Sequence, residues 1–287
     1  MMRPRKWSDP GWMLAPTTIL LIVFFIAPIG IAVYQSFFSW DLLTPPKAVG
    51  GANYLAIFKS GELLRVTGRT LFFSAMVVTG AMSIGLALAL LLNRRGLWFS
   101  FVRSAVFSAY VVSWVAVALL WLWILDPDRG IVAKGLHVAG VSSVKLLNHP
   151  DTVLPVLAGV TVWKITGYAM IMFLTGLQAI PNEVIEAARL DGAGAWSRFR
   201  FIIWPMLRPT GTFVGTTSLV ISFQAFDVVR VMTQGGPARA STLFVYAIYE
   251  SIFMNLRVGT ASALTVAFFV VLLSLSWLQI RAWRQKA

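Results

Sequence analysis

The amino-acid sequence predicts an all-α polytopic membrane protein with six transmembrane helices and both chain ends in the cytoplasm. Of its 287 residues, 58% are hydrophobic and 12% are charged, whereas about a quarter of the residues of a soluble domain are charged. Six stretches are long and apolar enough to cross a bilayer, which takes about 20 residues per helix. The formal charge of +13 lies mostly beside these stretches. This placement indicates membrane orientation, and no nucleic-acid partner is expected.

The first expectation concerns the spans and the sides of their connections. We expect the six helices at 13–38, 70–93, 104–125, 153–180, 210–231 and 258–280. One set of connections is twice as dense in Lys and Arg as the other, and cytoplasmic loops are the ones enriched in these residues. The dense set comprises 1–12, 94–103, 181–209 and 281–287. The chain therefore divides into a cytoplasmic N-terminus (1–12), a transmembrane domain (13–280) with a cytoplasmic loop (181–209), and a cytoplasmic C-terminus (281–287).

The connections expected outside the cytoplasm have their own local patterns. The segment Asn53–Arg69 mixes apolar and charged residues at helical spacing but is too polar to span, which predicts a helix lying in the membrane interface. Turn-forming residues at Asp126–Asp128 and Gly235–Pro237 predict loops in the segments 126–152 and 232–257.

Several kinds of chemistry are missing from the sequence. No Gly-Lys dipeptide occurs, so the phosphate-binding loop of a P-loop ATPase is excluded. The two histidines, His137 and His149, lack metal-ligand spacing, there is no cysteine, and Asp227 is the only carboxylate inside the expected spans. We therefore expect no catalytic residues, no metal site and no enzyme activity in this chain.

The cytoplasmic loop 181–209 has the pattern of two short helices joined by a turn. Pro181 suits the first turn of a helix, and Glu183 and Glu186 favour its positive end. Gly192 and Gly194 can end that helix. A second helix is expected from Trp196 to Trp204, where Pro205 and Pro209 would interrupt it.

These residues resemble the cytoplasmic signature of permease subunits of binding-protein-dependent ABC importers. Glu186-Ala187-Ala188, Gly192, Ile202 and Pro205 fall on the signature, and Trp204 stands where leucine is usual. Further stretches are similar to the carbohydrate-uptake branch, including sugar and glycerol-3-phosphate permeases of the first-subunit type. They are Asn53-Tyr54 with Phe58, Asp191-Gly192-Ala193, Thr233 to Pro237 with Ser241-Thr242, and Gly259 to Ala263.

The resemblance implies a type I ABC importer permease fold in the cytoplasmic (inner) membrane of a bacterium. It also implies a second homologous permease, an extracytoplasmic solute-binding protein, and two cytoplasmic ATPase subunits that hold ATP and Mg²⁺, with no cofactor in this chain. The ATPase would dock on the loop, where Glu186 is expected to make a charge-assisted contact. The coupling residues implied are Glu186, Ala187, Ala188, Asp191, Gly192, Ala193, Ile202 and Pro205.

Polar residues inside the expected spans mark a candidate substrate pathway. An ionisable side chain at mid-depth usually faces a cavity or a partner, and Lys164 lies there in the fourth expected span. The candidate pathway residues are Lys164, Trp163, Tyr168, Gln224 and Asp227. Two structural alternatives stay open: Lys164 pairs with Asp227, or Asp227 pairs with Arg230 one helical turn away.

The function expected from these observations is that of a permease subunit for a sugar or glycerol-3-phosphate-type solute. Lys164 would favour an anionic group such as phosphate, while a neutral sugar is equally compatible with the motifs. The alternative is an ion-coupled secondary transporter, which calls for more spans, internal repeats and midplane acidic residues. A membrane enzyme is disfavoured because catalytic sets are missing.

Overall fold

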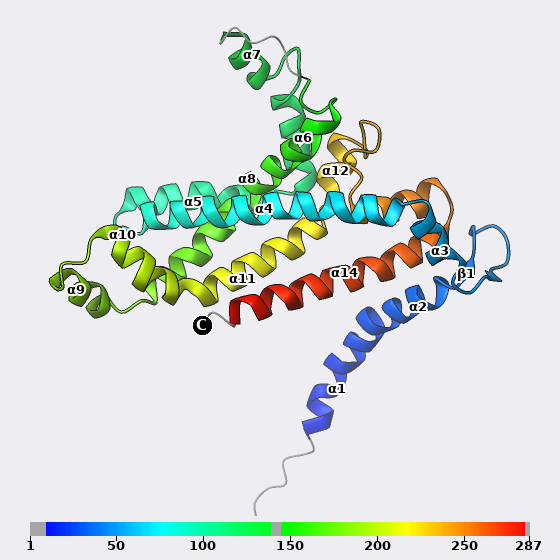
Figure 1. The fold of residues 1–287 in the computed structure, drawn as a ribbon, viewed down its shortest axis with the longest axis horizontal. Coiled ribbons are helices and arrows are strands. Elements are labelled where there is room, and N and C mark those ends of the chain that lie inside the picture. Colours follow the sequence, from blue (N-terminus) through cyan, green and yellow to red (C-terminus); the bar gives the residue numbers. More distant parts are fainter. Residues whose placement is uncertain (1–9, 139–144, 285–287) are drawn as a thin grey trace, which may run out of the picture. The chain divides into compact units, whose positions relative to one another are not determined.

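A computed structural model describes residues 10–138 and 145–284 of the chain. Most of the expected cytoplasmic N-terminus (1–9) and the last three residues of the C-terminus lie outside this described part. The chain divides into two compact units, one formed by 1–63 with 248–269 and the other by 64–247 with 270–287. Helices dominate both units (Figure 1).

The first unit contains the N-terminal helices and a small two-stranded sheet. Its elements are α1 (Pro10–Leu21), a π-helical turn η1 (Ile22–Ile26), α2 (Ala27–Gln35), β1 (Phe38–Ser39), β2 (Lys47–Ala48), α3 (Ala52–Lys59), a second π turn η3 (Glu250–Met254) and the N-terminal half of α14 (Val258–Arg284). The strands pair antiparallel, with Phe38 opposite Ala48.

The second unit holds most of the remaining helices. Its elements are α4 (Glu62–Leu92), α5 (Leu97–Val111), α6 (Trp114–Ile124), α7 (Ile131–Val138), α8 (Pro150–Gln178), α9 (Asn182–Leu190), α10 (Ala195–Arg198), the π turn η2 (Phe199–Ile203), α11 (Trp204–Phe223), α12 (Asp227–Met232) and α13 (Phe244–Tyr249). Helix α4 begins in the first unit, and the end of α13 belongs to it as well.

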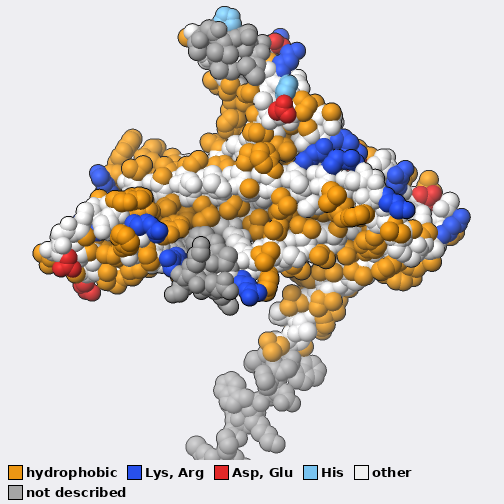
Figure 2. Space-filling model, viewed as in Figure 1, with side chains coloured by type: hydrophobic (Ala, Val, Ile, Leu, Met, Phe, Trp, Pro, Cys, Tyr) orange, Lys and Arg blue, Asp and Glu red, His pale blue; other side chains and the backbone are white. Residues whose placement is uncertain are grey.

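Long apolar helices confirm a multi-pass membrane protein. Four helical segments of the described residues are long and apolar enough to span: Leu14–Gln35, Glu62–Leu92, Pro150–Gln178 and Val258–Arg281. The pair α5 and α6, bent by 102°, makes a fifth if it counts as one span. Hydrophobic side chains cover much of the visible surface along the helices (Figure 2). The count of six spans and the cytoplasmic location of both ends stay predictions.

Three expected elements differ from the structure. The expected span at 104–125 is wrong as one helix, because the helix breaks at Val112–Ser113 between α5 and α6. The span at 210–231 is also wrong as one helix, since α11 ends at Phe223 and α12 begins at Asp227. A separate short helix within Asn53–Arg69 is confirmed only for the first part, α3, because 62–69 form the first turns of α4. Its position in the membrane interface stays a prediction.

The sequence predicts that Pro205 and Pro209 interrupt the second helix of the loop 181–209, and the structure shows that they do not. Trp204 continues the helix, and Pro205 and Pro209 lie inside α11. The π turn η2 comes directly before Trp204, whose N–H donates to the carbonyl oxygen of Phe199 five residues earlier. A proline lacks an N–H and crowds the carbonyl four residues before it, and a widened turn relieves that conflict. Pro28 follows η1 in the same way in the first span.

The core of the second unit is built around α8, which packs against α5, α6, α11 and α12. Side chains such as Leu157, Ile165 and Phe173 are fully buried along it. Gly167 brings α5 close, because a Cβ at this position would lie 2.5 Å from the carbonyl oxygen of Val106. The close approach places the C-terminal end of α5 beside the middle of α8.

In the first unit, the stretches that carry the family resemblance meet at one corner. The Nδ2 of Asn53 donates to the carbonyl oxygens of Ser36 (2.8 Å) and Phe38 (3.0 Å), and the hydroxyl of Tyr54 donates to Ser36 Oγ. The start of α14 joins the same corner, since a Cβ on Gly259 would lie 1.8 Å from the Phe38 oxygen. Asn53, Tyr54 and Gly259 therefore hold the end of α2 in place.

Candidate functional site: the loop 181–209 and a cavity at two helix breaks

The loop 181–209 forms two helices, α9 and α10, joined by a tight turn. Both lie at the end of the second unit where α8 finishes and α11 begins (Figure 1). Helix α9 starts directly after Pro181 and has Glu183 in its first turn and Arg189 in its last. These charges complement the helix dipole at each end. The two-helix expectation for 181–209 is confirmed in its outline.

The turn after α9 is a Schellman motif. The N–H of Ala193 donates to the carbonyl oxygen of Ala188 (2.9 Å), and the N–H of Gly192 donates to that of Arg189 (3.1 Å). Gly192 has φ of +78°, a left-handed conformation that glycine adopts without the strain of a Cβ. Arg198 Nη1 of α10 donates to the Ala193 oxygen (3.0 Å) and so ties the second helix to the turn. The geometry explains why the signature has glycine at position 192.

The outer surface of the loop carries both exposed apolar side chains and an exposed carboxylate. Ala188 is buried, whereas Glu186 and Ala187 are exposed on the same helix. Leu190 is 89% exposed and Trp196 is 73% exposed. Exposed apolar side chains of this size beside a carboxylate are typical of a protein-binding surface. Ile202 and Pro205 are partly buried where the loop joins α11.

A small cavity of about 260 Å³ lies where two helices are broken. Gln224 and Asp227 line it from the break between α11 and α12, and Trp114 lines it from the first turn of α6, directly after the break in the other helix. Irregular backbone at membrane depth is tolerated where it is buried in protein or lines a cavity. Sequence patterning did not single out Trp114, since a tryptophan in an apolar stretch has no distinguishing signal.

Lys164 lies behind this cavity and is 1% exposed. Its Nζ donates to the carbonyl oxygens of Ala109 (3.3 Å), Tyr110 (3.1 Å) and Val112 at the end of α5, and it lies 4.8 Å from the ring centroid of Trp114. Among the described residues, no ion pair joins Lys164 to Asp227, so that structural alternative is wrong. The ammonium instead satisfies the carbonyls that a helix end leaves without an intrahelical donor.

The other two candidate pathway residues are placed differently. Tyr168 stacks on Tyr110 with ring centroids 5.1 Å apart, and its hydroxyl donates to Thr217 Oγ1 at 3.4 Å. Trp163 lines a separate, apolar cavity and meets Trp121 edge-on at 5.7 Å. The structure thus brings Gln224 and Asp227 together at one cavity, places Lys164 next to it, and separates Trp163 from it.

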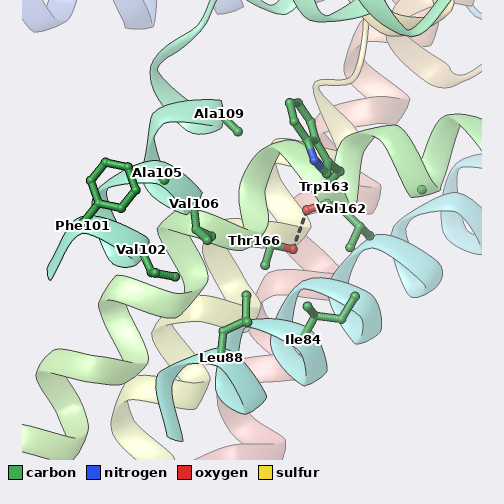
Figure 3. A pocket seen from close by; sticks show the side chains of 11 residues that line it. Ile84, Leu88, Phe101, Val102, Ala105, Val106, Ala109, Val162, Trp163 and Thr166 are labelled. Atoms are coloured by element: carbon green, nitrogen blue, oxygen red, sulfur yellow. Dashed lines mark hydrogen bonds between the residues drawn. The ribbon is translucent and has the colours of Figure 1, made fainter. Parts of the chain in front are cut away.

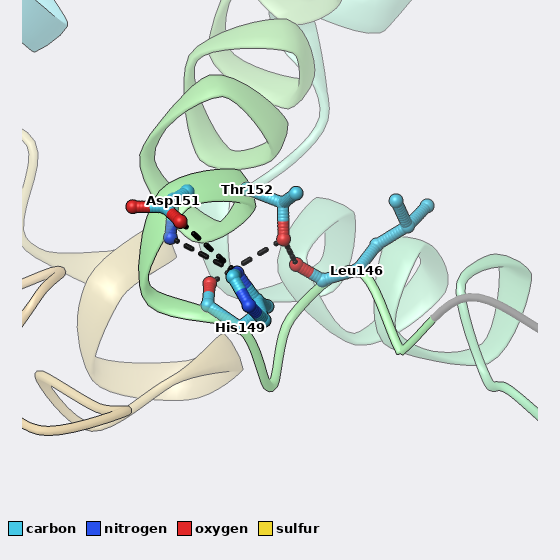
Figure 4. Close-up of polar contacts among 4 residues, drawn as sticks. All are labelled: Leu146, His149, Asp151 and Thr152. Carbon is cyan, nitrogen blue, oxygen red and sulfur yellow. Dashed lines mark hydrogen bonds and ion pairs between the residues drawn. The ribbon is translucent and has the colours of Figure 1, made fainter.

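His149 has a structural role at the start of α8. Its Nδ1 accepts from the N–H of Asp151 (3.4 Å) and lies 3.5 Å from Asp151 Oδ2, while Thr152 Oγ1 donates to the Leu146 oxygen (Figure 4). These contacts cap the helix N-terminus. No group of three or more metal-ligating side chains is found in the part of the chain that the structure describes.

Two connections contain ordered turns, as the sequence predicts. Asp126 Oδ1 accepts from the N–H groups of Arg129 and Asp128, and these hydrogen bonds, that of Arg129 first, lower the pKa of the Asp126 carboxyl. In the second connection, Ser241 Oγ donates to the Gly236 oxygen and lies 2.7 Å from Thr233 Oγ1. Ser241 is fully buried. The residues Thr233–Pro237, Ser241 and Thr242 therefore form one compact loop.

Comparisons with known proteins agree with this architecture. Residues 81–282 match the family described as "Binding-protein-dependent transport system inner membrane component". The chain is 33% identical over 274 residues to the sn-glycerol-3-phosphate transport system permease protein UgpA of Brucella abortus, covering 95% of this chain and 93% of that protein. It is 30% identical to the sulfoquinovosyl glycerol transport system permease protein SmoG of Agrobacterium fabrum, covering 98% and 94%.

A solved structure supports the fold over nearly the whole length. A chain of a bacterial ABC transporter involved in the import of the acidic polysaccharide alginate superposes with a TM-score of 0.83 and 24% identity, covering 98% of this chain and 99% of that chain. Fold and site define a multi-pass transport permease. The chain belongs to the binding-protein-dependent transport system inner membrane components, and the resemblance to carbohydrate ABC importer permeases is confirmed.

Proposed function

We propose that this chain is one of two homologous permease subunits of an ATP-driven importer in the cytoplasmic membrane of a bacterium. The other subunits are two cytoplasmic ATPases, which bind ATP and Mg²⁺, and an extracytoplasmic solute-binding protein delivers the solute. The cargo is a sugar or a glycerol-3-phosphate-type solute. The family match and the names of the relatives support this role.

The observation that carries the proposal is the exposed surface of α9 and its turn. Glu186, Ala187 and Leu190 are exposed on a helix whose other side is anchored by buried Ala188. Coupling needs a rigid element that contacts both the ATPase and the spans. The Schellman turn and the Arg198 hydrogen bond fix α9 to α10, and α10 continues through η2 into α11. A displacement of α9 by the ATPase would therefore also displace α11.

We place the substrate pathway at the cavity between the two helix breaks. Gln224 and Asp227 offer hydrogen-bonding groups and Trp114 offers a ring face, a combination that suits a hydroxylated solute. Lys164 acts as a positioning residue that holds the end of α5 and the start of α6 around this cavity. Tyr168 supports α5 through its stacking on Tyr110.

The test is uptake by proteoliposomes that contain the complete complex and the loaded binding protein. Uptake of glycerol-3-phosphate and of a panel of sugars should require ATP on the ATPase side and should stop when the ATPase subunits are left out. Ionophores that dissipate proton and sodium gradients should leave it unchanged. Uptake that needs no ATP but stops with the ionophore would instead establish an ion-coupled secondary transporter.

A further inference from the structure

Helices α4, α5 and α8 line an apolar cavity of about 640 Å³ that shares no lining residue with the cavity at the two helix breaks. Its walls include Leu88 of α4, Phe101, Val102 and Ala105 of α5, and Gly159 and Val162 of α8 (Figure 3). Thr166 also lines it, but its hydroxyl donates to the Val162 oxygen at 2.6 Å. A hydroxylated solute would find almost no hydrogen-bonding partner here.

A second cavity of about 670 Å³ lies at the ends of the same helices and is basic. Arg94 and Arg95 line it from the turn after α4, Arg103 from α5, Gln178 from α8, and Asn182 from α9. None of its lining residues is acidic. Three arginines that line one cavity without an acidic residue suit phosphate-bearing anions, since arginine matches phosphate oxygens with paired N–H donors.

The apolar and the basic cavity follow each other along the chain. Val102 and Arg103, consecutive in α5, line the apolar and the basic cavity, and Leu88 of α4 lines the first while Asn93 and Arg94, in the turn after α4, line the second. On α8 about three helical turns separate Thr166, in the apolar cavity, from Gln178, in the basic one. The arginines belong to the connection 94–103, which the charge distribution assigns to the cytoplasm. Trp98, 70% exposed, lies in the same connection, and tryptophan favours the depth of the lipid headgroups.

We propose that the two cavities form one binding site for an anionic phospholipid of the cytoplasmic leaflet. The headgroup phosphate lies among Arg94, Arg95 and Arg103, and an acyl chain lies in the apolar cavity beside Ala105 and Gly159. Basic pockets between transmembrane helices on the cytoplasmic side are suited to anionic headgroups. An acidic protein segment would match the arginines but would leave the apolar cavity unfilled. Because Asn182 of α9 lines the basic cavity, the bound headgroup touches the start of the coupling helix.

The experiment measures lipid retention by the purified complete complex. The complex is incubated in detergent with equal amounts of phosphatidylglycerol and phosphatidylcholine of the same acyl chains, and bound lipid is counted by native mass spectrometry. Wild type should retain phosphatidylglycerol in preference. Arg95→Gln should weaken its retention about fivefold, and Arg94→Gln with Arg95→Gln about thirtyfold, as expected for one and two arginines of an anionic-lipid site. Arg103 is left in place because it donates to the Leu92 and Arg94 oxygens.

Matched variants separate the headgroup from the acyl chain. Gly159 has open space around its Cβ position, so Gly159→Phe should fill the apolar cavity and reduce phosphatidylglycerol retention with every arginine intact. Gly68→Phe, at another open helical position, and Arg281→Gln, at an exposed arginine, should retain lipid as wild type does.

Three results would overturn the proposal. Equal retention of phosphatidylglycerol by wild type and by the double arginine variant would remove the headgroup site. Loss in the arginine variants with wild-type retention in Gly159→Phe would leave a headgroup site and would remove the acyl chain from the apolar cavity. Loss of ATPase subunits from the double variant with unchanged lipid retention would assign the arginines to the ATPase contact.

Discussion

Lys164 shows how a buried charge is accommodated in a membrane protein without an acidic partner. In place of water, its ammonium has hydrogen bonds to three backbone carbonyl oxygens at the end of α5 and a cation–π contact with the ring of Trp114. Carbonyls at a helix end inside the membrane have no solvent to satisfy them. The side chain therefore stabilises the break between α5 and α6, and the break in turn places Trp114 at the cavity.

Lys164→Met is expected to destabilise the complex, because it keeps much of the apolar stem and removes all three hydrogen bonds. The loss should be roughly 1–3 kcal/mol, the range for burying unsatisfied polar groups. Thermal unfolding of the purified complex measures it, with Lys59→Met at an exposed position of α3 as the matched control. Wild-type thermal stability combined with lost uptake would show instead that Lys164 acts on the solute.

At single positions, the sequence identified the residues better than their contacts. An ionisable residue at mid-span is expensive, so Lys164 was recognisable as an important residue. Its partners were not, because every residue has a backbone carbonyl and the sequence does not mark which ones accept, and the predicted pairing with Asp227 rests only on opposite charge. Asn53 and Gly259 were recognisable by family resemblance, but their meeting at the Phe38 oxygen depends on the tertiary fold.

Among the elements, the turn between α9 and α10 has the most specific geometry. Gly192 has a left-handed backbone conformation, whereas Gly194 has an ordinary extended one with φ of −65°. A Cβ added at either position would extend into open space. The two glycines lie in the same loop and are both exposed, so they form a matched pair in which only the backbone conformation differs.

Gly192→Val is expected to weaken attachment of the ATPase, and Gly194→Val is expected to leave it close to wild type. A β-branched residue in the left-handed region costs about 1–2 kcal/mol, which would distort the turn and tilt α9. Co-purification of the ATPase subunits with an affinity-tagged permease measures the effect. Equal recovery in both variants would mean that the Schellman turn does not present the docking surface.

The boundaries of the elements could be predicted only where local signals decide them. Pro181 and Gly192 bound α9 as expected, because capping chemistry is local. The breaks at Val112–Ser113 and Gln224–Phe226 contain neither glycine nor proline, so the sequence has no strong breaker signal there. Hydrogen bonds from Lys164 to carbonyl oxygens at the end of α5 stabilise the first break. Pro205 and Pro209 misled the expectation, because a π turn accommodates the first within a continuing helix.

The predicted membrane topology of the whole molecule rests on the uneven distribution of Lys and Arg between the two sets of connections. The chain has no cysteine, so single-cysteine variants report the side of each connection without background. Ser241 is buried and unsuitable for labelling, whereas Ala195 and Ala238 are both exposed and form a matched pair of alanine replacements.

Ala238→Cys is expected to react with a membrane-impermeant thiol reagent in intact spheroplasts, and Ala195→Cys is expected to react only after the membrane is opened. The positive-inside bias places Ala195 in the cytoplasm and Ala238 outside. Mass tagging of the purified protein gives the labelled fraction. Labelling of Ala195→Cys in closed spheroplasts would invert the topology and would move the coupling loop away from any cytoplasmic ATPase.

The family and the all-helical fold could be read from the whole sequence because span hydropathy, charge asymmetry and the loop signature agree. The number of spans could not be settled in the same way. Hydropathy counts apolar length, so it joins α5 to α6 across a 102° bend and joins α11 to α12 across a break. Bends of this kind are decided by packing and not by hydropathy.

The central claim is that α9 couples the conformational change of the ATPase subunits to movement of the spans. Solute-stimulated ATPase activity of the reconstituted complex tests it most directly. Glu186→Ala removes the exposed carboxylate of the signature, and it should preserve assembly in the membrane while abolishing most of the stimulation by loaded binding protein. Asp128→Ala removes an exposed carboxylate from the connection 126–152 and should keep wild-type stimulation. Full stimulation in Glu186→Ala would contradict the account.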